Sequence, residues 1–530
     1  MGKYVVKRLL HGVVSVICVV ILVMVLIYSL MNRDTIFAGD SNFSKQLNNS
    51  KVVYKNQRWE TYGYQDYVPY ADYINELARN GEIDEETRAA AVSIARTAEQ
   101  DSDIVAEYVQ KFTDYYQSKG YTVTRLDAVT IKTGRLADGG QQALFATRDV
   151  PLLSRVIGYF TGMFKFDNIH YAPEDAGIED RGLTFTLHDP VYNPTGTEGV
   201  FAPAIVGNGS YHKYLLYFDG QFPFLHQNFV TLNLGASYSV NQGVDVFTTM
   251  TQVQGAYVKK TLTFPTGLTE ESADNLHTAT YIRGSQSTSL LNSERFTDDY
   301  TNVETFKTGK SKLGYSFVIG ILSVIMSYVL GLPIGLLMAR YKDGFLDKLG
   351  TVYIIFITAV PSLAYIFLFK GIGGSLFGLP TAFDTDSSDK LMYVLPIVSL
   401  ALPSVAGLMK WMRRYMIDQM NSDYVKFARS GGLTESEIFT KHIWKNAMIP
   451  LVHGIPGSII FSMTGAIITE RVYVVPGAGN LLTRAINAYD NGVIVGVTLF
   501  YAVLSVVAII LGDVMMAMVD PRISFTDKAR

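Results

Sequence analysis

The chain has 530 residues, of which 48% are hydrophobic and only 18% are charged, so part of it is expected to lie in lipid. Its formal net charge of −3 excludes the overall basic field of a nucleic-acid-binding protein, and we expect no nucleic-acid partner. The single cysteine, Cys18, excludes an internal disulfide and a cysteine-based metal site.

Six stretches are long enough to cross a bilayer as helices, which requires about 20 apolar residues. Together they contain one acidic residue, Asp513, and no lysine or arginine. The first stretch exceeds a signal-peptide core and lacks a following A-x-A site, so we expect it to be retained. The six predicted transmembrane helices are Val13–Met31, Tyr315–Met338, Leu349–Phe369, Leu391–Met409, Met448–Ile468 and Val493–Met518.

Lysine and arginine in the short connecting segments predict the orientation, because they accumulate on the cytoplasmic side. Residues 410–447 carry seven of them, whereas Lys370–Lys390 and Glu470–Gly492 carry two each. We therefore expect both termini and residues 410–447 in the cytoplasm of a bacterium, with residues 32–313 outside the cell membrane. The predicted domains are residues 1–31, the inserted domain 32–313 and the core 314–530.

The insertion is predicted to be a mixed α/β domain. Asp84–Gly120 is predicted as helix, because Ile104, Tyr108 and Phe112 recur at helical spacing before a terminal glycine. Tyr121–Ile131 and Val244–Thr263 are rich in residues typical of strands.

An aromatic repeat also lies in the insertion. Tyr159-Phe160-x-Gly162-x-Phe164-x-Phe166 recurs 58 residues later as Tyr217-Phe218-x-Gly220-x-Phe222-x-Phe224. Amphipathic segments at the membrane surface and ordinary core packing explain the repeat equally well, and both interpretations stay open.

A patterned polar stretch, Tyr424–Pro450, separates the fourth and fifth predicted spans. Ser422 or Asp423 can cap a short helix that ends at Gly431-Gly432, and Thr434 to Glu437 has the capping-box pattern that starts the next helix. The sequence predicts two short helices that meet at a glycine corner and receive a push from a cytoplasmic partner; the alternative is a plain connection. One face of the second helix should carry Ile438, Phe439, His442, Ile443 and Ala447.

This stretch resembles the EAA loop of ABC importer permeases, with Lys426-Phe427-Ala428 in place of Glu-Ala-Ala and Gly432 in place of the motif glycine. It is most similar to the oligopeptide and dipeptide permease branch, and above all to the enlarged Ami-type oligopeptide permease subunits of Gram-positive bacteria. Other similar segments are Lys3–Leu10, Leu234-Gly235-x-Ser237-Tyr238-Ser239, Glu470, Pro476-Gly477-Ala478-Gly479 with Leu481-Leu482, and Asp520-Pro521-Arg522.

The resemblance implies an α-helical polytopic type I ABC importer permease that forms half of a pathway for short oligopeptides. It implies a heterodimer with a second homologous permease, two cytoplasmic ABC ATPases, an external peptide-binding lipoprotein and surrounding membrane lipid. The coupling residues that it implies in the cytoplasmic loop are Asp423, Tyr424, Ala428, Arg429, Gly431, Gly432, Leu433 and Glu437.

This chain is not expected to be an enzyme or to bind a cofactor, since the resemblance places ATP and magnesium in the partner ATPases. Its only P-loop-like fragment, Gly309-Lys310-Ser311, has Glu304 where the first glycine of the motif belongs. No sequence motif indicates a metal site.

Candidates for the pathway are prolines that interrupt spans and a membrane-embedded acid: Pro361 with Ser362, Pro403 and Asp513. Dipeptides or nickel chelates are alternative substrates. A membrane receptor or sensor with an external ligand domain is the alternative from a different class.

Overall fold

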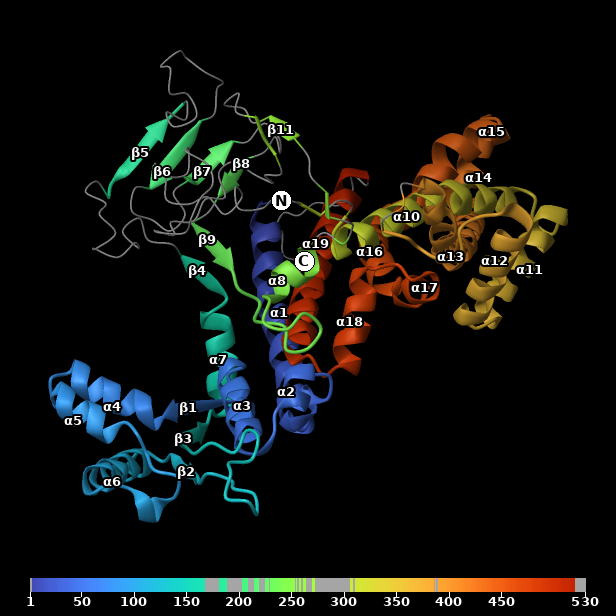
Figure 1. Ribbon diagram of the computed structural model, residues 1–530. Coiled ribbons are helices and arrows are strands. Elements are labelled where there is room, and N and C mark those ends of the chain that lie inside the picture. The colour runs from blue at the N-terminus through green and yellow to red at the C-terminus, as the bar shows by residue number, and fades with distance from the viewer. Residues whose placement is uncertain are drawn as a thin grey trace.

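The computed structural model describes residues 2–166, 181–187, 203–207, 214–218, 225–227, 229–252, 254, 257–258, 261–263, 269–271, 306–307, 310–385, 387 and 389–519. Two long helices, α1 (Gly2–Leu30) and α19 (Asn491–Val519), run side by side through the middle of the molecule (Figure 1). A second group of helices, built around the pair α10 (Lys312–Arg340) and α13 (Val394–Met420), extends to the right in this view.

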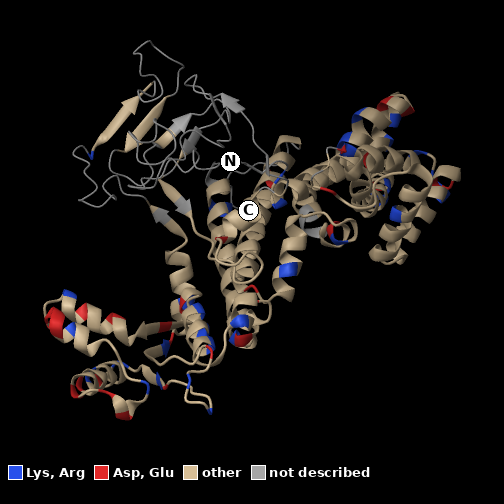
Figure 2. Ribbon diagram, in the orientation of Figure 1, with Lys and Arg blue, Asp and Glu red and all other residues tan. Residues whose placement is uncertain are grey.

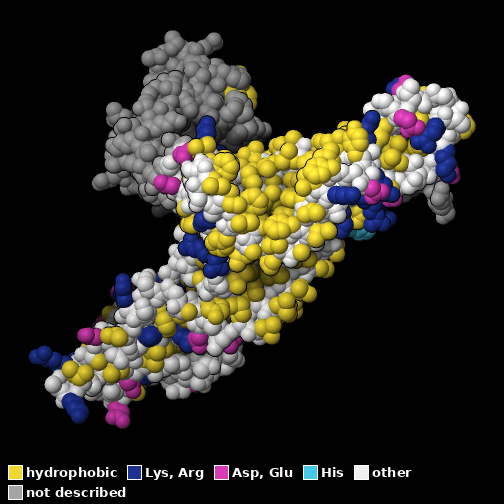
Figure 3. Space-filling model, turned by 90° about the vertical axis from the view of Figure 1, so that its right-hand side faces the viewer, with side chains coloured by type: hydrophobic (Ala, Val, Ile, Leu, Met, Phe, Trp, Pro, Cys, Tyr) yellow, Lys and Arg dark blue, Asp and Glu magenta, His cyan; other side chains and the backbone are white. Residues whose placement is uncertain are grey.

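Four helices in the described part of the chain are long and apolar enough to cross a membrane. They coincide with the first, second, fourth and sixth predicted spans, which embeds the chain in the membrane. Figure 2 shows that these helices carry little charge along most of their length, and Figure 3 shows a broad apolar surface over this part of the molecule. The four are Tyr4–Leu30, Lys312–Arg340, Lys390–Met420 and Asn491–Val519.

The third predicted span is not one helix, so the prediction of a helix over Leu349–Phe369 is wrong. It consists of α11 (Phe345–Ala359) and α12 (Ser362–Phe377), which are bent by 114° relative to each other. Pro361 causes the break, because proline lacks an N–H donor and disfavours a helical conformation in the residue before it. Val360 is accordingly extended, with φ −85° and ψ 131°.

The region of the fifth predicted span contains α16 (Trp444–Gly465), a helix of 22 residues with Pro450 and Pro456 inside it. It is followed by α17 (Ile467–Tyr473) and α18 (Ala478–Asn487), and α18 packs against α19. Because α16 is not among the four helices named above, the count of six spans stays a prediction.

The first part of the insertion is an antiparallel sheet of three strands in the order β1-β3-β2, which helices cover. Ile74, Phe112 and Leu144 lie in the shared core. The strand predicted within Tyr121–Ile131 is confirmed as β2. The elements are η1 (Arg33–Phe37), α2 (Ser41–Lys45), α3 (Asn48–Thr61), β1 (Gln65–Pro69), α4 (Tyr70–Arg79), α5 (Glu85–Ala91), η2 (Ala98–Gln100), α6 (Asp103–Ser118), β2 (Thr122–Leu126) and β3 (Ala143–Asp149).

The helix predicted over Asp84–Gly120 is present only in part, because two separate N-caps divide it. Asp84 accepts a hydrogen bond from the Thr87 N–H and starts α5, and Ser102 starts α6. Between them, Asp101 accepts hydrogen bonds from the Ala95 N–H, at 2.8 Å, and from Arg125, which hold a non-helical connection.

The next part of the insertion contains a four-stranded antiparallel sheet, β5-β6-β7-β8, which lies apart from the first sheet in Figure 1. Helix α7 precedes it and packs against α1. The elements are α7 (Leu152–Thr161), β4 (Phe164–Phe166), β5 (Leu183–Thr186), β6 (Ala204–Gly207), β7 (Tyr214–Phe218), β8 (Leu225–Gln227), β9 (Val230–Leu232), α8 (Val246–Thr251), β10 (Tyr257–Val258), β11 (Thr261–Thr263), β12 (Thr269–Glu271) and β13 (Phe306–Lys307).

Two predictions for this part need comment. Val244–Thr263 has a composition typical of strands, but Val246–Thr251 forms α8, because the Asp245 side chain accepts a hydrogen bond from the Thr248 N–H. The first aromatic segment is divided: Tyr159 and Phe160 pack against the cluster around Val156, whereas Phe164 and Phe166 are 53% and 71% exposed. Most of the second segment, together with Glu304, Gly309 and residues 520–522, lies outside the described residues.

Candidate functional site

The polar stretch after α13 forms the predicted glycine corner. Helix α14 (Asp423–Ser430) follows Ser422 at its N-cap and ends where the Gly431 N–H bonds the Phe427 carbonyl oxygen at 2.9 Å. Gly432 then adopts φ +83°, a left-handed conformation that residues with a Cβ rarely adopt.

The predicted capping box at the start of the next helix is also confirmed. The Thr434 hydroxyl oxygen accepts from the Glu437 N–H at 3.3 Å, and the Glu437 carboxylate accepts from the Thr434 N–H at 3.1 Å. The hydrogen bonds from Thr434 lower the pKa of Glu437, so the box is held by an ionised carboxylate. Helix α15 (Glu435–Glu437) continues through a π-helical turn, η6 (Ile438–Ile443), which the sequence did not predict, into α16.

The inner face of this loop is packed against the ends of α10 and α13. Val425 and Ile438 are fully buried, and Phe439 and Ile443 are nearly so. The predicted apolar face is therefore confirmed, except that His442 is half-exposed. These side chains form one cluster with residues of α10, α13 and α16, so a force on the loop reaches three long helices. The residues of these helices in the cluster are Leu332, Ala339, Met412, Met416, Ala447 and Leu451.

The outer face of the loop is exposed and charged. Phe427, on α14, is 80% exposed, and the Arg429 Nε lies 2.5 Å from a Glu435 carboxylate oxygen across the corner. This exposed ion pair adds little to stability, since such pairs contribute about 0–1 kcal/mol. Phe427 is therefore our candidate for a contact with another protein, since aromatic residues are enriched in such contacts.

Two residues that the sequence did not single out connect α11 to α13. Asp347 is 3% exposed and accepts two hydrogen bonds from Arg413, from Nε at 2.6 Å and from Nη2 at 2.8 Å. The Asp343 N–H donates a third, at 2.9 Å. This paired geometry makes the contact strong and directional. Only the clustering of charges next to a predicted span could have indicated it.

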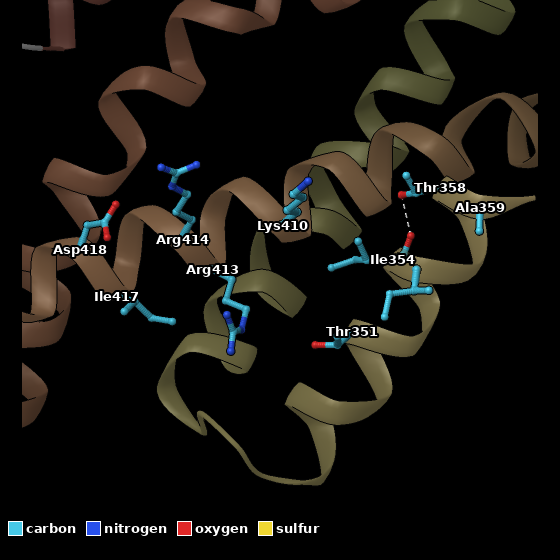
Figure 4. A pocket seen from close by; sticks show the side chains of 10 residues that line it. Thr351, Ile354, Thr358, Ala359, Lys410, Arg413, Arg414, Ile417 and Asp418 are labelled. Atoms are coloured by element: carbon cyan, nitrogen blue, oxygen red, sulfur yellow. Dashed lines mark hydrogen bonds between the residues drawn. The ribbon is translucent and has the colours of Figure 1, made fainter.

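A cavity of about 640 Å³ lies between α11 and α13 (Figure 4). Figure 4 shows Arg413 pointing away from Lys410 and Arg414, which leave the opposite side of α13. Thr351, Ile354 and Thr358 form the wall on α11. None of the four pathway candidates lines this cavity, and their role in a pathway stays a prediction.

The candidate Asp513 takes part in a contact between α19 and α1. Its Oδ2 accepts a hydrogen bond from the Tyr4 hydroxyl at 2.7 Å and lies 3.3 Å from the Arg8 Nε. His453, on α16, has its Nδ1 3.9 Å from Oδ1. The acid at this position therefore has a basic partner on the first helix.

The residues around Glu470 form a tight buried cluster. Its carboxylate accepts hydrogen bonds from the Ser316 hydroxyl at 2.6 Å and from the Asn480 N–H at 2.9 Å. A Cβ atom on Gly477 would lie 2.3 Å from the Glu470 Cδ, and one on Gly479 would lie 2.6 Å from an Ile467 side-chain carbon. Both glycines are therefore required by close approach, while Pro476 lies in the turn between α17 and α18.

Burial raises the pKa of Glu470, which lies outside the predicted spans, and the Ser316 and Asn480 bonds offset only part of this effect. Above pH 4.5, the ordinary pKa of this carboxyl group, the unfolded state loses the proton before the folded state does. The free energy of unfolding should therefore fall as the pH rises from 4.5 to the raised pKa of the folded state. We expect Glu470→Gln to fold and to lose less stability than the native chain over that window. Thermal unfolding of both forms at several pH values measures this, and parallel curves would contradict it.

Asp490 is, after Asp347, the second acidic residue that the sequence did not single out, and it fixes the insertion to the start of α19. Asp490 is fully buried and accepts hydrogen bonds from the Ser237 hydroxyl at 2.6 Å and from the N–H groups of Tyr238, Ser239 and Val240 at 2.9–3.0 Å. The sequence indicated the Ser237-Tyr238-Ser239 segment but not its partner, which is some 250 residues away.

Comparison with known proteins places these features in a family. Residues 331–525 match the model of the binding-protein-dependent transport system inner membrane component. The oligopeptide transport system permease protein AmiC of Streptococcus pneumoniae is 35% identical over 100% of this chain and 99% of its own length. The dipeptide transport system permease protein DppB of Lactococcus lactis is 31% identical over 42% of this chain and 73% of its own length. This chain therefore belongs to the oligopeptide permease branch of the binding-protein-dependent ABC importer permeases.

Proposed function

We propose that this chain is one transmembrane half of an ATP-driven importer for short oligopeptides. The observation that carries the proposal is the loop between α13 and α16, within residues 410–447, whose inner face is buried against α10, α13 and α16 while its outer face exposes Phe427 beside charged side chains. Such a loop can bind a cytoplasmic ATPase and pass its movement to the spans.

The names of the relatives support the choice of substrate. AmiC is named an oligopeptide permease and DppB a dipeptide permease, so oligopeptides are our first candidate and dipeptides the second. AmiC matches the whole chain, insertion included, whereas DppB matches 42% of it. The receptor alternative has no support from these relatives.

We infer the partners from the family and from the loop. Two ABC ATPases would bind the loops of this chain and of a second homologous permease, and they would hold the ATP and magnesium. A peptide-binding lipoprotein would deliver substrate from outside, where we place residues 32–313. The distribution of lysine and arginine supports this orientation, with the loop and both termini in the cytoplasm.

Single-cysteine labelling tests both the partner and the orientation. In a Cys18→Ser background, Phe427→Cys should resist an impermeant maleimide in intact cells and react in inside-out vesicles that lack the ATPases. The bound ATPases should slow that labelling about tenfold or more, since Phe427 is 80% exposed on this chain alone.

The matched control is Lys132→Cys, on an exposed turn of the insertion, which should react in intact cells. Labelling of Phe427→Cys from outside would overturn the orientation. Equal labelling with and without the ATPases would overturn the docking surface while leaving the orientation in place.

A further inference from the structure

A cavity of about 480 Å³ lies where the C-terminal half of α1, helix α7, the segment 233–238 and the start of α19 meet. It is distinct from the loop 410–447 and from the cavity between α11 and α13. Tyrosines dominate its wall, and its only basic side chain is Arg155 of α7. The tyrosines are Tyr28, Tyr62, Tyr159 and Tyr238.

The guanidinium group of Arg155 has one N–H donor, on Nε, that is left without an acceptor. Its guanidinium lies 4.5 Å from the ring centre of Tyr64 and 5.3 Å from that of Tyr28, and its Nη2 donates to the Tyr64 carbonyl oxygen at 2.6 Å. Its Nε is buried without a hydrogen-bond partner. Arg155 as a whole is half-buried, and no ion pair among the described residues includes it.

A second polar group of the same helix is also without a partner. The hydroxyl of Tyr159, one turn after Arg155, is buried and makes no hydrogen bond. Both groups can donate, and both line the same cavity. An oxyanion could accept from the two together, and the planar guanidinium group donates paired hydrogen bonds to two oxygens of a phosphate or carboxylate.

The surroundings favour an oxyanion that is attached to lipid. Val156 of α7 packs into one cluster with Val20 and Met24 of α1, which places α7 beside a membrane helix. Near this contact, the C-terminal half of α1 exposes Leu22, Leu26 and Leu30 by 60%, 48% and 77%. Acyl chains can lie against these side chains of α1, and tyrosines are enriched at the depth of lipid headgroups.

We propose that the cavity binds the phosphate of an anionic phospholipid through Arg155 and Tyr159, in the leaflet at the C-terminal end of α1. Free phosphate carries the same oxyanion, so the experiment must separate the two sources. The site would fix α7, and with it the insertion, to the membrane next to α1. The inference does not rest on the proposed transport function.

Native mass spectrometry of the purified intact complex tests the proposal with phosphatidylglycerol as the probe. The native complex should retain one more lipid than the Arg155→Gln variant, whose affinity should be lower by about tenfold or more. Tyr159→Phe removes only a hydroxyl without a partner in the described chain, so it should fold normally and bind about threefold to tenfold more weakly.

The matched control is Arg148→Gln, because Arg148 is 48% exposed on β3 and is paired with Asp66. It should retain the lipid. Inorganic phosphate should neither displace phosphatidylglycerol nor raise the unfolding temperature in an Arg155-dependent way; if it did, a free anion would be the ligand and the lipid assignment would fall. Equal lipid retention by the native, Arg155→Gln and Tyr159→Phe complexes would overturn the site itself.

Discussion

Gly432→Val is expected to leave the permease in the membrane and to reduce ATP-driven peptide uptake about tenfold or more, while ATP hydrolysis continues. Gly432 has φ +83° and open space around its Cβ position, so the change introduces backbone strain and no clash. An L-residue in this region costs about 1–2 kcal/mol, and a β-branched one more, so the corner should open and move α14 relative to α15. Peptide uptake and ATP hydrolysis by reconstituted complexes measure the effect together.

The neighbouring glycine provides the control. Gly431 has an ordinary φ of −76°, and a Cβ there would make only a normal contact, 3.4 Å from the Ala428 carbonyl oxygen. Gly431 is also a predicted coupling residue, but Gly431→Ala introduces no backbone strain, so it should keep clearly more uptake than Gly432→Val. Full uptake by Gly432→Val, or equal loss in both variants, would show that the left-handed conformation is not what couples the loop.

Asp490→Ala is expected to be the most destabilising substitution of a single side chain at the outer end of α19. It removes the acceptor of the Ser237 hydroxyl and of the Tyr238, Ser239 and Val240 N–H groups. Each buried donor that is left without a partner costs about 1–3 kcal/mol. The segment 237–240 should detach, and the complex should unfold at a distinctly lower temperature.

Asp490→Asn should be only partly better, because its NH₂ group would face N–H donors in place of an acceptor. Asp114→Asn is the control, since Asp114 is exposed and accepts only from Gln110. A double-mutant cycle with Ser237→Ala should give a coupling energy of about 0.5–3 kcal/mol. Additive effects of the two substitutions would show that the contact between them carries no stability.

Local patterns predicted the features that depend on neighbouring residues. Apolar length located α1, α10, α13 and α19, and the spacing of Thr434 and Glu437 predicted a capping box that the structure confirms. Such features depend only on residues that are close to each other in the sequence. The coupling roles of the loop residues stay predictions.

Features that depend on distant partners were missed. Nothing near Asp490 in the sequence indicates that it accepts four hydrogen bonds from residues 237–240, and Asp347 and Arg413 are 66 residues apart. Proline at position 361 indicated an interruption, but the 114° angle depends on how α11 and α12 pack on the other helices. The π-helical turn after Glu437 is likewise set by the burial of Ile438 and Phe439 against α10 and α13.

The break between α11 and α12 also restricts what can surround it. At Val360 and Pro361 the helical ladder stops, so carbonyl oxygens at the end of α11 lose their intrahelical donors, and Pro361 contributes no N–H. Hydrocarbon offers no hydrogen bonds, and each unsatisfied peptide group at that depth costs several kcal/mol. The break between α11 and α12 is therefore surrounded by water or by polypeptide, and acyl chains are excluded from it.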